Sequence, residues 1–261
     1  MKTHQYIVLG IILCLAFAVR LYRFDNPVAD WHSWRQADTS AVSRNFVKHG
    51  YDLFHPTYDD ISNVQTGKDN PQGYRFVEFP IFNIFQAGLF QLIGIFTLEQ
   101  WGRLVTIFAS LGSITFIFLL ARKFANMTTA IAASLFFALN PYSIYYGRVI
   151  LPDPFMAMAA LGGVWFFSLS LESKNQESRI KNYGFALLAF IFTSSALLLK
   201  PFAVFFLLPM GWLVLRYQSW KGFLSWKLWL FAIFSLAPLA WWRIWMMQYP
   251  DGLPSATFVL P

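Results

Sequence analysis

The chain has 261 residues, of which 57% are hydrophobic, 20% aromatic and only 13% charged, about half the charged share of an ordinary soluble domain. A soluble enzyme, a disordered chain and a disulfide scaffold are excluded, because the chain holds one Cys and more Phe and Trp than a soluble protein of this size buries. The net charge of +7 comes from short basic clusters between apolar runs, a pattern typical of membrane topology signals rather than of nucleic-acid binding.

Eight apolar stretches are long enough to cross a bilayer. They lie at 6–22, 80–97, 101–121, 128–147, 154–171, 183–199, 201–217 and 228–247. A cleavable signal peptide is the alternative for the first stretch, since Ala16–Ala18 resembles a cleavage site. Arg20 and Arg23 follow at once, which favours an anchored helix.

Basic clusters at 122–123, 174–181 and 216–227 give the topology. The positive-inside rule places all three in the cytoplasm, and this works only if one of the eight stretches does not cross. The stretch 80–97 is the weakest, because it begins at Pro80 and carries Asn83, Gln86 and Gln91. We therefore predict an all-α polytopic membrane protein with about seven transmembrane helices, in which 80–97 forms an interfacial helix on the outer face.

This topology divides the chain into four parts: a first transmembrane helix (1–22), a large outer loop with juxtamembrane helices (23–100), six further transmembrane helices (101–247) and the start of an outer loop (248–261). Because the chain stops just after a membrane exit, a fragment of a longer protein is one interpretation. Within this outer loop, the segment 23–79 holds eight of the 13 acidic residues and three of the four His, so we expect the chemistry there.

The segment 30–39 concentrates two Trp, one His, one Arg and two Asp directly after a membrane exit. From Gln36 to Val47 the spacing of apolar residues predicts an amphipathic helix along the membrane, with Asp38 in its first turn. Asp38 is then either an acid favoured by the helix dipole or a catalytic base. A merely solvated loop is the simpler interpretation of the whole segment. The substrate-binding candidates in this loop are His32, Trp34, Arg35, Gln36 and Glu78.

Six cations fall at predicted outer helix ends, against the positive-inside trend: Arg20, Arg23, Arg103, Arg148, Lys200 and Arg243. They either snorkel to phospholipid phosphates or form a cationic bowl for a lipid phosphate. Lys200 is the most informative, because the apolar run 183–217 must turn at Lys200 without a polar loop. In the loop 148–153, Arg148 and Asp153 either form an exposed ion pair or face the same bowl.

Cys or His pairs at metal-ligand spacing and a Gly-rich phosphate loop are both absent from the sequence. We therefore predict no metal site and no certain cofactor. A weakly bound divalent metal on the carboxylates of the outer loop is left open.

The chain resembles the polytopic GT-C glycosyltransferases, and within them the bacterial protein mannosyltransferase and lipid A aminoarabinose transferase relatives. The stretches that carry the resemblance are Trp31–Thr39, 41–46, Glu78–Phe82, Gly102–Leu104, Ala121–Phe124, Asn140–Asp153 and Leu199–Pro201. Phe79 departs from the aminoarabinose branch, which has a lysine before the proline that matches Pro80. The first loop also lacks the Asp-Glu pair typical of protein mannosyltransferases.

The resemblance implies a polyprenyl-phosphate-linked sugar donor, with Asp38 as catalytic base and Asp30 in reserve. Arg148 and Asp153 match the family's second outer-loop pair, and Lys200 matches its outer turn lysine. The expected partners are this donor, a glycan, lipid or protein acceptor and membrane lipid, with no nucleic acid. The expected location is a bacterial inner membrane, with the site facing the periplasm or exterior. A transporter or lipid-binding protein and a structural membrane subunit are the alternatives.

Overall fold

The computed structural model describes residues 3–28, 30–172 and 176–254, and every regular element in these ranges is a helix. The prediction of an all-α chain is confirmed. Lys174 of the second predicted cytoplasmic cluster and the end of the predicted last loop (255–261) lie outside the described residues. The elements are α1 (Thr3–Arg20), α2 (Ser33–His49), α3 (Ile81–Ile93), α4 (Leu98–Phe124), α5 (Met127–Leu139), α6 (Pro141–Tyr146), α7 (Asp153–Ser170), α8 (Gln176–Leu199), η1 (Pro201–Phe206), α9 (Leu207–Gln218), η2 (Trp220–Leu224), α10 (Trp226–Met246) and η3 (Pro250–Gly252).

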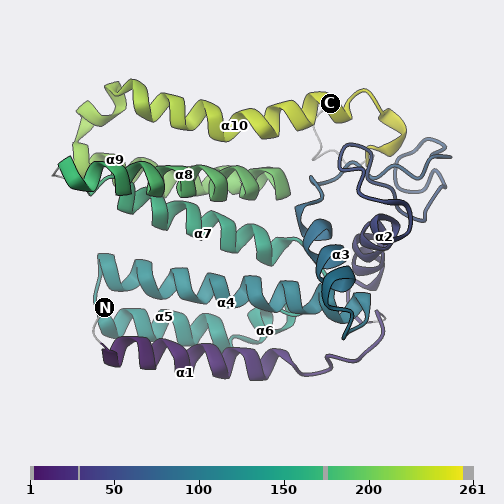
Figure 1. The fold of residues 1–261 in the computed structure, drawn as a ribbon, viewed down its shortest axis with the longest axis horizontal. Helices are drawn as coiled ribbons and strands as arrows, with labels where there is room; N and C mark the ends of the chain where they lie inside the picture. The colour runs from purple at the N-terminus through teal and green to yellow at the C-terminus, as the bar shows by residue number, and fades with distance from the viewer. Residues whose placement is uncertain (1–2, 29, 173–175, 255–261) are drawn as a thin grey trace.

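The long helices form a bundle in which α1, α4, α5, α7, α8, α9 and α10 run side by side (Figure 1). The α1 helix packs on α4 and α5, α4 packs on α7, and α8 lies between α7 and α10. Close approach depends on small residues: Gly112 of α4 lies against Met158, and Gly163 of α7 lies against Thr193, with no room for a Cβ atom. This small-residue packing is typical of helices that associate inside a membrane.

Five helical segments in the described part of the chain are long and apolar enough to cross a membrane: 3–20, 98–124, 182–199, 201–218 and 226–246. An 18-residue helix is about 27 Å long, close to the roughly 30 Å of a hydrocarbon core. The shorter α5 and the helix α7, which begins at the charged residue Asp153, run alongside these segments. The protein is therefore an integral membrane protein, and the figure of seven crossings stays a prediction.

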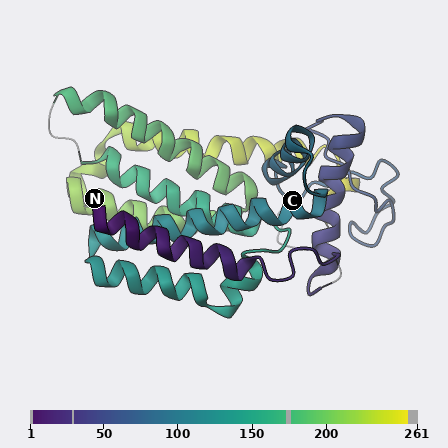
Figure 2. The same cartoon turned by 60° about the horizontal axis from the view of Figure 1, so that its bottom comes forward.

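Two helices, α2 and α3, lie across one end of the bundle, together with the loops of residues 50–79 (Figures 1 and 2). The α3 helix has 13 residues, or about 20 Å, which is too short to cross a bilayer. Its polar residues face α2: Ser43 Oγ donates to Gln86 Oε1 (2.8 Å), and Asn83 Nδ2 donates to the Thr39 carbonyl (2.7 Å). The polar side chains of this apolar stretch thus join the two helices.

The loop 50–79 is also tied to the C-terminal end of α10. Trp245 Nε1 donates to the Phe54 carbonyl (3.0 Å), and a hydrogen bond of 3.0 Å joins His55 Nε2 to the Tyr249 hydroxyl. The ring of Phe76 stacks on that of Tyr249, with centroids 5.4 Å apart. This end of the bundle therefore brings together residues that are distant in the sequence.

Two predicted helix boundaries are wrong. The predicted span 128–147 breaks at Asn140, whose side chain caps the new helix α6 by accepting from Tyr142 N (3.0 Å), with Pro141 in the first turn. The predicted outer helix begins at Ser33 rather than Gln36. Asp38 consequently lies in the second turn, beyond the orphan N–H groups of the helix start, so the helix-dipole interpretation of its position is wrong.

Candidate functional site

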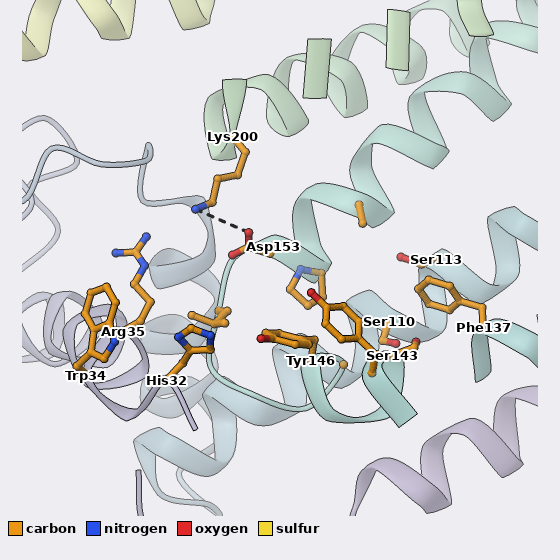
Figure 3. A pocket seen from close by; sticks show the side chains of 15 residues that line it. His32, Trp34, Arg35, Ser110, Ser113, Phe137, Ser143, Tyr146, Asp153 and Lys200 are labelled. Carbon is orange, nitrogen blue, oxygen red and sulfur yellow. Dashed lines mark ion pairs between the residues drawn. The ribbon is translucent and has the colours of Figure 1, made fainter. Parts of the chain in front are cut away.

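A cavity of about 470 Å³ opens where the N-terminal end of α2 meets the bundle. Its walls come from the start of α2, from α4, α5 and α6, from the start of α7 and from Lys200, which follows α8. Five predicted site residues line it: His32, Trp34, Arg35, Asp153 and Lys200. Figure 3 shows the three residues next to α2 on one side, and Lys200 and Asp153 pointing toward each other. The structure thus brings together residues that are far apart in the sequence.

Lys200 lies between the end of α8 and the start of η1 and directs its ammonium into this cavity. Its Nζ lies 3.8 Å from Asp153 Oδ1, a long ion pair in which the Lys200 side chain is 20% exposed and that of Asp153 48%. Asp153 is distant from Lys200 in the sequence, and the packing of the helices brings the two together. The pair is loose enough that an anion entering the cavity can compete with Asp153 for the ammonium.

Arg35 is held by Glu78, which does not itself line the cavity. Arg35 Nη2 donates to both Glu78 carboxylate oxygens at 2.7 Å, and both side chains are largely buried. Within the described ranges, Nη1 and Nε of Arg35 make no hydrogen bond, so they keep donors for a ligand. A guanidinium with one nitrogen fixed and two available is suited to a phosphate group.

Asp38 lies outside the cavity lining, on the part of α2 that faces the loop 50–79. Its carboxylate pairs with Arg75 (3.2 Å) and accepts from Gln65 Nε2 (2.9 Å). Burial raises the pKa of the Asp38 carboxyl, while the Gln65 hydrogen bond and the charge of Arg35 oppose the shift. The neighbouring guanidinium of Arg75 opposes it as well. Asp38 therefore has the raised pKa of a candidate base, but not a place in the cavity wall.

Asp30 and Gln36 form a buried link beside the cavity. Gln36 Nε2 donates to Asp30 Oδ1 (2.6 Å), and Gln36 Oε1 accepts from Ile150 N (3.1 Å). Gln36 is fully buried and joins α2 to the loop before α7, so it does not lie where a substrate would touch it. Asp30 Oδ2 is also buried and has no hydrogen-bond partner in the part of the chain that the structure describes.

Two of the six outer cations have structural partners and do not belong to the predicted bowl. Arg20 is fully buried and donates to Ser110 Oγ (2.9 Å) and the Ala138 carbonyl (2.9 Å). Arg103 is 2% exposed and donates to carbonyls of the segment 23–27. Both guanidinium groups donate to backbone carbonyls, and that of Arg20 also donates to the hydroxyls of Ser110 and Ser143, so neither is directed at a lipid phosphate.

Arg148 does not pair with Asp153 in the described structure, so the predicted exposed ion pair is wrong. Its guanidinium is buried between the rings of Tyr145 and Tyr22, with centroids 5.4 and 5.7 Å away. Asp153 pairs with Lys200 instead. Arg148 thus adds positive charge behind the cavity without lining it.

A family model for dolichyl-phosphate-mannose-protein mannosyltransferases matches residues 77–245. The chain belongs to the dolichyl-phosphate-mannose-protein mannosyltransferase family. No curated protein and no solved structure matches it significantly. Because it belongs to this family, the protein is a membrane glycosyltransferase that uses a lipid-linked sugar donor. The interpretations as a transporter or as a structural membrane subunit are set aside.

The matched range of the mannosyltransferase family includes Glu78, Arg148, Asp153 and Lys200, whereas the α2 candidates precede it. Both parts contribute to the cavity, since α2 supplies one wall. Among the described residues, no group of three or more His, Cys, Asp or Glu is placed to hold a metal ion.

Sequence reasoning missed the rest of the cavity wall. The rings of Tyr142 and Tyr146 lie 4.4 Å apart, and both residues line the cavity. Ser110, Ser113 and Ser143 line it from the bundle side. Isolated Ser residues in apolar helices are common, so these positions gave no distinct signal before the helices were placed.

Proposed function

We propose that the protein transfers a sugar from a polyprenyl-phosphate donor to an acceptor hydroxyl or amine at the outer face of the membrane, with inversion. The observation that carries this proposal is the pair of cations in the cavity, because Lys200 has a loose partner and Arg35 keeps two nitrogens for a ligand. A lipid phosphate reaching this end of the bundle would find two donors of positive charge.

In the proposed reaction, the acceptor oxygen or nitrogen attacks the anomeric carbon of the sugar. The bond from that carbon to the phosphate oxygen breaks, and the polyprenyl phosphate leaves with the electron pair. The phosphate is already a good leaving group, so Lys200 and Arg35 need only stabilise its charge. One direct displacement, without a covalent enzyme intermediate, inverts the anomeric configuration.

A base must accept the proton that the acceptor loses. Asp38 is the first candidate because its pKa is raised, and Asp30 is the second because one of its oxygens has no partner in the described residues. Asp153 is a third candidate for the base, because it lies in the cavity wall. Asparagine variants at these three positions separate the possible bases.

The test incubates membranes that contain the protein with a panel of polyprenyl-phosphate-linked hexoses and pentoses, and measures released polyprenyl phosphate. We expect release from at least one donor and a strong reduction in a Lys200→Met variant. The anomeric configuration of the product, determined by NMR, reports inversion or retention. Release from no donor, or equal release by the Lys200→Met variant, would contradict the proposed role of the cavity.

A further inference from the structure

A second cavity lies in the outer region, at the other end of α2 from the first. It has a volume of about 380 Å³, and its wall includes Asn45, His49, Asp52, His55, Gln72 and Tyr74. Along α2, His49 is about 21 Å from Arg35, at about 1.5 Å per residue. The two cavities are therefore separate sites on one rigid helix.

The two cavities differ in charge. Arg35 and Lys200 line the first, whereas no Lys or Arg among the described residues lines the second. Asp52 is a carboxylate in this second wall, and its Oδ2 lies 3.0 Å from His55 Nδ1 while its Oδ1 accepts from the backbone N–H of His55 (3.1 Å). A site without free cations does not suit a phosphate, and it favours an uncharged polar ligand.

The second cavity offers hydrogen-bonding groups that the fold does not use. Asn45 Nδ2 donates to the carbonyl (3.0 Å) and the Oγ1 (3.3 Å) of Thr57, which leaves Asn45 Oδ1 as an acceptor. In the described ranges, the side chains of His49 and Gln72 and the hydroxyl of Tyr74 make no hydrogen bond. Together they present donors and acceptors at several points of the cavity wall.

The opposite part of the wall is held in place. His55 bridges Asp52 and the Tyr249 hydroxyl, each at 3.0 Å, and its ring lies 5.9 Å from that of Tyr74. Aromatic rings beside free amide and hydroxyl groups match the two kinds of surface on a sugar ring, which has C–H faces and a hydroxyl edge.

We propose that this cavity binds an uncharged saccharide unit of the acceptor. The distance between this cavity and the reaction cavity is longer than one monosaccharide, so the acceptor would have to be larger than a single sugar. The proposal rests on the proposed function, because it names the acceptor as a glycan or glycan-bearing molecule. His49, Gln72 and Tyr74 would contact the sugar hydroxyls, and the first cavity would hold the donor phosphate.

The test uses the full chain, purified in a detergent without a sugar head group, and neutral trisaccharides of mannose, glucose and N-acetylglucosamine as probes. Saturation-transfer difference NMR measures their binding to the parent and to His49→Ala, Gln72→Ala and Asn63→Ala variants. Asn63 is an exposed residue of the same loop and lies outside the cavity, so its variant is the matched control. We expect binding of at least one trisaccharide, weakened about tenfold by either cavity variant and unchanged in the control.

Three results would overturn the proposal: no trisaccharide binds, binding survives both cavity variants, or inorganic phosphate displaces the sugar. The last would place the sugar in the cationic first cavity. Release of polyprenyl phosphate from the donor is measured separately and should be the same in the control Asn63→Ala as in the parent. A protein that binds trisaccharide but releases no lipid phosphate would refute the proposed function, whereas release without saccharide binding would refute only this second site.

Discussion

The carboxylates near the first cavity differ in their partners, and this makes their roles separable. Asp38 is paired with Arg75 (3.2 Å), whereas Asp30 Oδ2 has no partner in the described part of the chain. If Asp38 is the base, Asp38→Asn should lower kcat by a factor of about 10² to 10⁴. Arg75→Gln breaks the same ion pair but keeps the carboxylate, so it is the matched control. Equal losses in both variants would assign the effect to the ion pair and not to proton transfer.

The pH dependence of the reaction follows from the same residue. A base must be ionised, and burial raises the pKa of Asp38, so kcat/KM should fall as the pH decreases through that raised pKa. The fall should begin at a higher pH than for an ordinary Asp, whose pKa is about 3.9. A pH–rate profile measures this, and Arg75→Gln should move the acid limb to still higher pH, since a positive charge that stabilises the carboxylate is lost. An acid limb that persists unchanged in Asp38→Asn would mean that another group titrates.

Lys200 should affect donor binding more than turnover. Lys200→Met removes a charged donor to the lipid phosphate, so the KM for the donor should rise by about 10- to 100-fold, and Lys200→Arg should retain more affinity. Asp153→Asn removes the carboxylate 3.8 Å from the ammonium and should not weaken donor binding through this contact. Donor KM and kcat, measured separately for the three variants, decide this. A Lys200→Met variant with parental KM would favour the snorkelling interpretation.

At the residue scale, the sequence predicted which side chains gather at the first cavity better than it predicted their pairing. Lys200 was selected as a cation at a helix end, Arg35 as part of the segment 30–39 and Asp153 as part of the loop 148–153, and all three line one cavity. The Lys200–Asp153 pair joins α8 to α7, and the Arg35–Glu78 pair joins α2 to the loop before α3. Such pairings depend on how the helices pack, which local patterns do not report.

At the element scale, the short helix α6 brings Gly147 against the Arg20 guanidinium. A Cβ at Gly147 would lie 2.6 Å from Arg20 Nε, 2.6 Å from the Ser143 carbonyl oxygen and 2.8 Å from Ser110 Oγ. Gly147→Ala should therefore destabilise the fold by about 1–3 kcal/mol. Thermal unfolding in detergent measures this. Gly10→Ala is the control, since Gly10 lies in α1 with nothing within 4 Å of an added Cβ, and it should be neutral or stabilising.

The elements themselves were largely predictable, because long apolar runs separated by basic clusters leave little choice of structure. The errors came at capping residues. Asn140 and Pro141 stop α5 and start α6 inside a continuous apolar run, and His32, with φ of 59°, starts α2 before its apolar spacing begins. A left-handed His at a helix start has no local signature in the sequence.

At the scale of the whole molecule, the topology makes a direct prediction. If residues 23–100 lie outside and the α4–α5 turn inside, Cys at Glu99 should react with an impermeant thiol reagent added to intact cells, and Cys at Met127 should not. Cys14 is exposed on α1 and must first be replaced. Labelling after permeabilisation shows that both sites are reactive. The reverse pattern in intact cells would invert the topology and move the reaction to the cytoplasm.

The contact between the loop 50–79 and the end of α10 has a consequence for how the enzyme is made. Phe54 and Trp245 are 191 positions apart, so the loop leaves the ribosome long before the rings that cover it. Until α10 enters the membrane, the aromatic side chains of the loop lack their partners and are exposed to chaperones and proteases. The end of the molecule that holds the loop 50–79 is therefore finished last during biosynthesis, and a chain that stalls before α10 would lack the hydrogen bonds of this loop to Trp245 and Tyr249.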